Sequence, residues 1–83
     1  ELAGRRVLIT GASSGIGRAL AIRLAQAGAK LALAARSEDR LRELADSLSA
    51  QGTQVLPIRA DVTNDADRAR IMAEVKSQLG GLD

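Results

Sequence analysis

The chain of 83 residues contains no Phe, Trp or Tyr, no Cys and no His. Without Cys, neither a disulfide framework nor a Cys-based metal site is possible, and the missing His removes the commonest metal ligand and general base. The core must be built from Leu, Ile, Val and Ala, which bury less area per residue than aromatics. No apolar run approaches the roughly 18 residues that span a membrane, and no signal-peptide pattern opens the chain. We therefore expect a soluble, cytoplasmic protein without a metal site or membrane contact.

An excess of charge of one sign is also missing. Lys and Arg number 12 against 10 Asp and Glu, a net charge of +2, and the two signs alternate along the expected helices. This pattern differs from the basic footprint of nucleic-acid-binding proteins, so we expect no nucleic-acid partner. The length allows one small domain at most, over residues 1–83, and chains near this size bury only roughly 60–65% of their unfolded surface. We therefore expect that the chain is either marginally stable or part of a larger protein.

Short apolar runs alternate with helical periodicity along the chain. Strands are expected over residues 7–9, 31–35 and 55–58. The helices between and after them end near Gly28, Gly52 and Gly80, and Ser37 and either Thr63 or Asn64 begin the later two. Their apolar faces are expected to consist of Ile16, Leu20 and Leu24, of Leu41, Leu44, Ala45 and Leu48, and of Ile71, Val75 and Leu79. The alanines of residues 31–35 suit a helix equally well, and only the length and position of this run favour a strand. The β-α-β-α-β-α order predicts an α/β fold with a parallel sheet and right-handed crossovers.

The segment TGASSGIG, residues 10–17, connects the first expected strand to the first expected helix. Such a loop lies at the carboxyl edge of a parallel sheet, where unpaired N–H groups and the helix dipole favour a phosphate. Gly11, Gly15 and Gly17 allow unusual backbone angles and let a pyrophosphate approach without meeting a Cβ. A glycine-rich turn without a ligand is the alternative, whereas the G-x-x-x-x-G-K-[ST] loop is excluded by its spacing and by the lack of a nearby Lys. We predict a pyrophosphate site.

TGASSGIG matches the pattern TGxxxGIG, and through it the chain resembles the short-chain dehydrogenase/reductase family. The resemblance covers all 83 residues, including the basic end of the second strand and ADV after the third. It implies a Rossmann-type doubly wound parallel sheet, of which this chain is the incomplete N-terminal half with strand order 3-2-1. It also implies that the loop backbone around Ser13, Ser14 and Ile16 holds the ribose and pyrophosphate. The carboxylate of Asp61 would then contact the adenine amino group, with the backbone of Val62 beside it; a turn or capping role is the alternative for Asp61.

The second expected strand ends in Ala35-Arg36-Ser37, where an NAD-binding unit usually carries an acid for the ribose 2′-hydroxyl. A guanidinium pairs instead with a 2′-phosphate, often through two parallel hydrogen bonds. By family resemblance, Arg36 assisted by Ser37 is similar to the NADP-selecting pattern. A solvent-exposed arginine in an Arg-rich chain is the alternative, and Glu38 and Asp39 keep NAD open as the less favoured cofactor. We predict NADP.

The family's catalytic residues are absent from the chain. The resemblance implies a later catalytic Ser and a Tyr-x-x-x-Lys pair, but the chain has no Tyr and no serine in the matching position. In the strand order 3-2-1-4-5-6 the first strand is central, so its apolar edge over residues 7–9 is expected to be open. Pro57 fits the opposite, outer edge because it cannot donate to a neighbouring strand. We therefore predict the cofactor-binding half of a larger reductase, with no catalytic residue of its own.

The leading functional hypothesis is an NADP(H)-dependent oxidoreductase that moves a hydride between nicotinamide and a carbonyl or alcohol carbon. A small-molecule carbonyl or alcohol would bind through the missing half, and a homo-oligomer stays open. The first alternative is a non-catalytic dinucleotide-binding module or an engineered minimal Rossmann fragment. The second is another α/β nucleotide binder such as a methyltransferase, against which Arg36 and Asp61 argue together.

Overall fold

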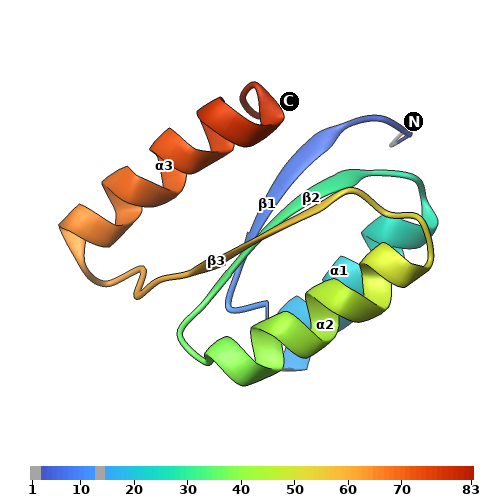
Figure 1. The fold of residues 1–83 in the computed structure, drawn as a ribbon, viewed down its shortest axis with the longest axis horizontal. Coiled ribbons are helices and arrows are strands. Elements are labelled where there is room, and N and C mark those ends of the chain that lie inside the picture. Colours follow the sequence, from blue (N-terminus) through green and yellow to red (C-terminus); the bar gives the residue numbers. More distant parts are fainter. Residues whose placement is uncertain (1–2, 13–14) are drawn as a thin grey trace.

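The computed structural model describes residues 3–12 and 15–83. Its elements are β1 (Arg6–Thr10), α1 (Gly15–Gln26), β2 (Lys30–Ala35), α2 (Glu38–Ala50), β3 (Val55–Arg59) and α3 (Asp65–Leu79). The three strands are parallel in the order β1-β2-β3. Helices α1 and α2 cover one face of the sheet and α3 covers the other (Figure 1). The predicted α/β fold, strand order and element sequence are confirmed, and Pro57 lies on an outer strand as expected.

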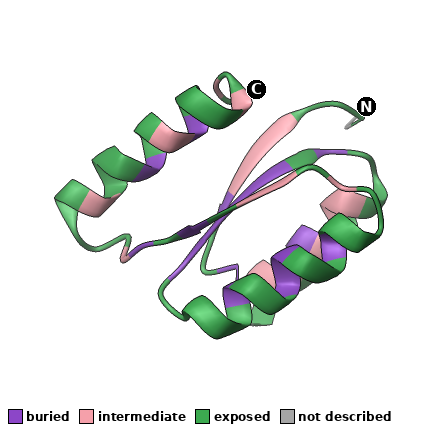
Figure 2. Cartoon of the chain, in the orientation of Figure 1, coloured by how far each residue is buried: buried purple, intermediate pink, exposed green. Residues whose placement is uncertain are grey.

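The central strand β2 is buried on both of its faces (Figure 2). Its side chains alternate between two cores, because successive residues of a strand point to opposite faces. Leu31 and Leu33 belong to the core beneath α1 and α2, whereas Ala32 and Ala34 belong to the core beneath α3. Burial on both faces explains the uninterrupted apolar run, since a strand without a solvent face needs no polar alternation.

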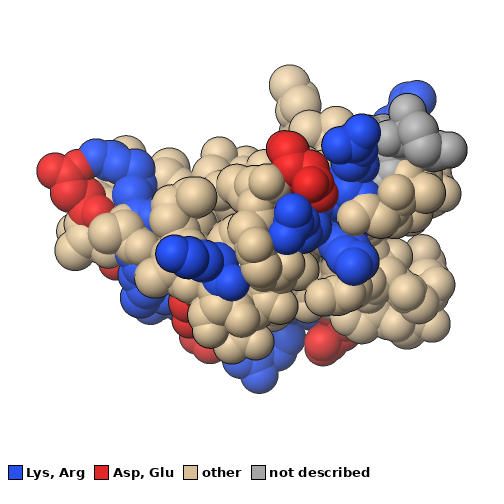
Figure 3. All heavy atoms as spheres, turned by 90° about the horizontal axis from the view of Figure 1, so that it is seen from above, with Lys and Arg blue, Asp and Glu red and all other residues tan. Residues whose placement is uncertain are grey.

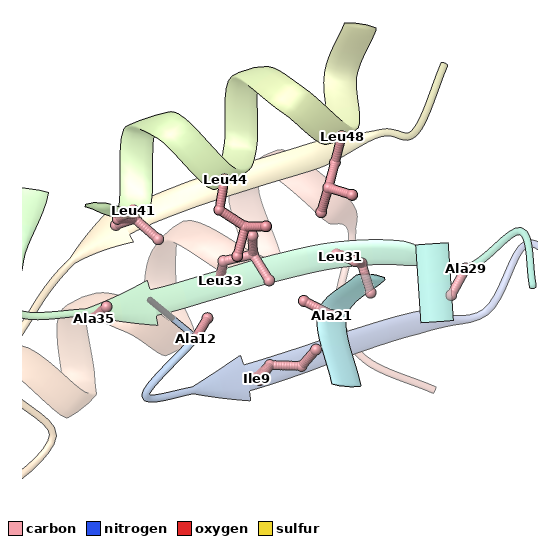
Figure 4. Packing of buried hydrophobic residues seen from close by; sticks show 10 residues of the cluster. All are labelled: Ile9, Ala12, Ala21, Ala29, Leu31, Leu33, Ala35, Leu41, Leu44 and Leu48. Atoms are coloured by element: carbon pink, nitrogen blue, oxygen red, sulfur yellow. The ribbon is translucent and has the colours of Figure 1, made fainter. Parts of the chain in front are cut away.

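The larger core lies between the sheet and the pair α1 and α2 (Figure 4). It consists of Ile9, Ala12, Ala21, Ala29, Leu31, Leu33, Ala35, Leu41, Leu44 and Leu48. The leucines of α2 are the predicted apolar face of that helix, which is confirmed. Each fully buried leucine contributes roughly 1.5–3 kcal/mol relative to an exposed one, so this layer supplies most of the apolar burial in a chain without aromatic residues.

Helix α1 packs on the sheet through a different face from the predicted one. Ile16 and Leu20 are 88% and 45% exposed, whereas Ala21 is fully buried and Leu24 packs against the core. The prediction is therefore wrong for Ile16 and Leu20 and right for Leu24. The physical reason is close approach: small residues on α1 let the helix backbone lie near the sheet, which turns the larger side chains at positions 16 and 20 outward.

Helix α3 forms a smaller core on the opposite face. Its buried residues are Ile71 and Val75, with Leu79 partly buried, as predicted for its apolar face. The side chain of Asn64 caps the helix by accepting a hydrogen bond of 3.0 Å from the backbone N–H of Asp67. Of the two predicted N-cap residues, the structure therefore selects Asn64.

The outward face of α3 carries acidic and basic side chains interspersed with uncharged surface (Figure 3). Ion pairs at the spacings i,i+3 and i,i+4 join Arg68 to Asp65, Arg70 to Asp67 and Arg70 to Glu74. Such exposed pairs each contribute little to stability. Across residues 3–12 and 15–83, no helix has the length and apolar character that crossing a bilayer requires.

At the amino end of β1, Arg6 joins the strand to the residues that follow α3. Its guanidinium donates to both carboxylate oxygens of Asp83 at 3.1 Å, and its backbone N–H donates to Oδ2 at 2.7 Å. The backbone N–H of Asp83 donates in return to the carbonyl of Arg6 at 3.0 Å. These bonds, the guanidinium first, lower the pKa of Asp83 to about 2. Within the described residues β1 pairs with β2 alone, so the expected open edge is present.

Candidate cofactor-binding site

A cleft of about 370 Å³ opens at the carboxyl end of the sheet. Its walls come from the ends of the three strands and the loops that follow them, which is where open parallel sheets bind ligands. The lining residues are Gly11, Ala34, Ala35, Arg36, Ser37, Ala60, Asp61, Val62 and Thr63. The structure thus brings five of the predicted site residues around one space: Gly11, Arg36, Ser37, Asp61 and Val62. Ser13 and Ser14 lie outside the described residues.

The first two glycines of the loop are required by the backbone conformation. Gly11 and Gly15 have φ values of 65° and 54°, the left-handed region that costs other L-residues roughly 1–2 kcal/mol. Among the described residues other than the chain neighbours, no atom lies within 4 Å of a Cβ built at either position. The space beside both glycines is therefore open, and a ligand can approach the backbone there.

Gly17 is required for a different reason. A Cβ on this residue would overlap the carbonyl oxygen of Gly11 and lie 2.9 Å from its carbonyl carbon. The missing side chain lets α1 begin directly against the end of β1, which places the helix N-terminus beside the loop. The first turn of α1 carries no acidic side chain, so no carboxylate neutralises the positive end of the helix dipole. Ile16 lies in this turn with its side chain exposed.

The carboxylate of Asp61 is held in place by its own loop. The backbone N–H and the hydroxyl of Thr63 both donate to its Oδ1, at 2.9 and 2.7 Å, as in an Asx-turn. The hydroxyl bond first, then the backbone bond and the charge of Arg36, lower the pKa of Asp61. Its Oδ2 accepts no hydrogen bond from any described residue, so an ionised acceptor oxygen remains for a ligand N–H.

Thr63 is a site residue that the sequence analysis missed. It was weighed there as a helix cap, a role that Asn64 fills, whereas Thr63 lines the cleft and fixes Asp61. The spacing Asp-x-Thr is the available signal, because an Asp side chain commonly accepts from the backbone two residues later.

Arg36 and Ser37 follow directly after β2, and both side chains are exposed. Neither side chain forms a hydrogen bond or an ion pair with another described residue. Ser37 occupies the predicted N-cap position of α2, but its hydroxyl makes no capping bond. The acid nearest in sequence, Glu38, is paired with Arg42 at 3.4 Å. Both Arg36 and Ser37 are thus available to an anion in the cleft.

The chain matches the family model described as short chain dehydrogenase over residues 5–83. It belongs to the short-chain dehydrogenase family. A hydroxysteroid 11-beta-dehydrogenase 1-like protein of Xenopus tropicalis is 46% identical over 83 residues, which cover 99% of this chain and 29% of that protein. The family predicted from TGASSGIG is confirmed, and the relatives include dehydrogenases and a reductase.

Two solved structures of short-chain dehydrogenases share the fold closely. L-sorbose reductase from Gluconobacter frateurii, in complex with NADPH and L-sorbose, superposes with a TM-score of 0.95 at 41% identity, over 99% of this chain and 32% of that one. A short-chain dehydrogenase/reductase from Burkholderia phymatum, in complex with NAD, gives 0.95 at 38% identity, over 99% and 29%. The chain spans 27–32% of the length of the first curated relatives. It corresponds to the Rossmann-type dinucleotide-binding region of the family, and its neighbours carry either cofactor.

Proposed function

We propose that the chain binds NADP(H) and is the cofactor-binding part, residues 1–83, of an oxidoreductase acting on a carbonyl or alcohol substrate. One observation carries the proposal: a single cleft collects Gly11, Arg36 with Ser37, and Asp61 with Val62. These groups fit the parts of a dinucleotide, because they offer an open backbone, unpaired cationic and hydroxyl groups, and a free carboxylate oxygen. The bound nicotinamide would supply or accept the hydride.

Different residues would bind different parts of the cofactor. The glycine loop and the start of α1, including the backbone of Ile16, would hold the pyrophosphate, since the positive helix end faces it. Asp61 would accept a hydrogen bond from the adenine amino group, with the backbone of Val62 beside the ring. The two hydrogen bonds from Thr63 that lower its pKa support this role, because they hold the carboxylate in place beside the cleft.

The preference for NADP over NAD would come from Arg36, assisted by Ser37. An acid in this position would accept from the ribose 2′-hydroxyl and repel a 2′-phosphate. Arg36 instead offers a guanidinium with no carboxylate within ion-pair distance among the described residues, and Glu38 is held by Arg42. A phosphate that meets an unpaired guanidinium gains charge-assisted hydrogen bonds without breaking existing ones.

Titration of the chain with NADPH and NADH tests this function. For Arg36→Ala we expect the affinity for NADPH to fall by at least about tenfold, the size of lost charged hydrogen bonds, with NADH changed less than about twofold. Arg23→Ala, which removes an exposed arginine from the last turn of α1, is the matched control and should bind as the unmodified chain does. Equal losses for both cofactors would show that Arg36 does not select the 2′-phosphate.

A further inference from the structure

A second cavity, of about 310 Å³, adjoins the cofactor cleft between β3 and the start of α3. Arg36, Ala60 and Asp61 line both spaces. Arg59, Asp67 and Arg70 complete the second one, which we call the arginine pocket. The guanidinium proposed for the 2′-phosphate therefore lies on the boundary between the cleft and a pocket that contains two more arginines.

Arg70 is already neutralised within the arginine pocket. Its guanidinium lies 3.8 Å from the carboxylate of Asp67 and 3.5 Å from that of Glu74. It also donates a hydrogen bond to the backbone carbonyl of Arg59. Asp67 in turn accepts from the backbone N–H of Asp61 at 2.8 Å. These contacts fix Arg70 in a structural network and leave it with little charge for a ligand.

Arg59 differs from Arg70 in having no partner for its guanidinium. No carboxylate lies within ion-pair distance of it, and its side chain forms no hydrogen bond, among residues 3–12 and 15–83. The side chain is exposed at the end of an outer strand. Two of the three arginines of the pocket, Arg36 and Arg59, therefore form no ion pair with a described residue, although the charge of Arg36 is near enough to Asp61 to lower the pKa of that carboxyl.

The strand register brings these two arginines near each other. Arg59 of β3 pairs with Ala35 of β2, so Arg36 is the next residue beyond the pair. Neighbouring strands lie about 5 Å apart. Two long arginine side chains at that separation can both reach one anion that lies between them. The pairing also puts the Arg59 side chain on the sheet face of Ala35, the face that α1 and α2 cover. Both residues border the same pocket, and Arg59 can approach an anion at Arg36 from that face.

We propose that Arg59 supplies a second guanidinium to the 2′-phosphate of NADP(H). Arg36 would contact the phosphate from the cofactor cleft and Arg59 from the end of β3, on the sheet face that α2 covers. The inference rests on the proposed function, because it needs a phosphate at Arg36. It adds a specificity-determining residue on β3, outside the loop that follows β2. A phosphate dianion has enough acceptor oxygens for two guanidinium groups.

The test is a double-mutant cycle that measures binding of 2′,5′-ADP and 5′-AMP to the chain, two probes that differ only in the 2′-phosphate. For Arg59→Ala we expect affinity for 2′,5′-ADP to fall about fivefold, as for an exposed charge pair, and affinity for 5′-AMP to stay within about twofold. Arg59→Lys should lose less, because it keeps the charge but not the planar fork. The double variant with Arg36→Ala should lose less than the two single losses multiplied together, since both guanidiniums share one phosphate.

The outcomes separate this inference from the proposed function. If Arg59→Ala binds 2′,5′-ADP as the unmodified chain does while Arg36→Ala does not, the role of Arg59 is wrong and the NADP proposal stands. If the unmodified chain binds both probes equally, the NADP proposal fails and the role of Arg59 fails with it. Equal loss of both probes in Arg59→Ala would also overturn the inference. Circular dichroism of each variant, with Arg23→Ala as control, verifies the fold.

Discussion

At the amino end of the sheet, the guanidinium of Arg6 donates to both oxygens of Asp83, and each residue's backbone completes the contact. At the carboxyl end, Arg36 and Arg59 lie beside open spaces with no carboxylate within ion-pair distance among the described residues. The first arrangement uses the charge to join β1 to the end of α3. The second leaves the charge for an anion from outside. Among these three arginines at strand ends, the two that we propose to bind a phosphate are the two without a carboxylate partner.

Gly17 lies at the carboxyl end of the sheet and Gly28 at the amino end. Of the changes that we predict, replacing Gly17 should have the largest effect on stability. Gly17→Ala should lower the free energy of unfolding by roughly 1–3 kcal/mol, because the new Cβ overlaps the backbone of Gly11. It should also weaken NADPH binding, since α1 has to move away from the loop. Urea unfolding followed by circular dichroism, together with NADPH titration, measures both effects.

Gly28→Ala is the matched control at the amino end. Its φ of 88° makes a side chain strained, and a Cβ would lie 3.3 Å from the Cα of Ala3, a contact that a small shift relieves. We expect a loss of about 1 kcal/mol and unchanged affinity for NADPH. If Gly17→Ala unfolds at the same urea concentration as the unmodified chain, the close approach of α1 to β1 is wrong.

The pH dependence of stability tests the amino end. The pKa of Asp83 is lowered to about 2 from about 3.9 in an unfolded chain. A lowered folded-state pKa means that the carboxylate stabilises the fold above about pH 4 and loses this contribution as the pH falls toward 2. We expect Asp83→Asn to have a lower urea midpoint than the unmodified chain at pH 7, and the difference to shrink below about pH 4.

Two further variants test whether the contact at the amino end acts independently of the cleft. Asp46→Asn, which changes an exposed aspartate of α2 without an ion pair in the described structure, should follow the unmodified chain at every pH. Asp83→Asn should bind 2′,5′-ADP normally, because its contact lies at the opposite end of the sheet from the cleft. A midpoint difference that is constant from pH 2 to pH 7 would contradict the role given to the Arg6–Asp83 pair.

The sequence predicted the order of strands and helices because each element carries a local signal. The buried run of β2 and the leucine face of α2 are examples, and so are the glycines that end the helices. It failed for α1 because hydrophobic periodicity counts large side chains, whereas Gly17 and Ala21 pack there because they are small. Burial at Ile16 and Leu20 could not be judged without knowing how closely α1 approaches the sheet.

As with the fold, part of the candidate site could be predicted from the sequence. The glycine loop, Arg36 and Asp61 are predicted because a motif or a residue type marks them within a short segment, and the structure places Gly11, Arg36 and Asp61 around one cleft. Thr63 was missed although the spacing Asp-x-Thr is a local signal, because such a turn does not by itself mark a ligand site. The role proposed for Arg59 has no local signal. The Asx-turn from Thr63 to Asp61 is local, whereas the place of Arg59 beside Arg36 follows only from the pairing of β3 with β2.

The smallest expected effects compare two helix caps at the carboxyl end. Asn64 makes its capping bond and Ser37 does not. The two residues therefore allow a side chain with a hydrogen-bond partner to be compared with one that has none, at the same end of the sheet. Asn64→Ala should cost about 1 kcal/mol of stability and leave 2′,5′-ADP binding unchanged. Ser37→Ala should leave the urea midpoint unchanged and weaken 2′,5′-ADP binding by about two- to threefold, since under our proposal its hydroxyl would contribute one hydrogen bond to the phosphate. A loss of stability in Ser37→Ala without a loss of affinity would mean that Ser37 acts as a cap after all, and Arg36 would then have no helper in the loop after β2.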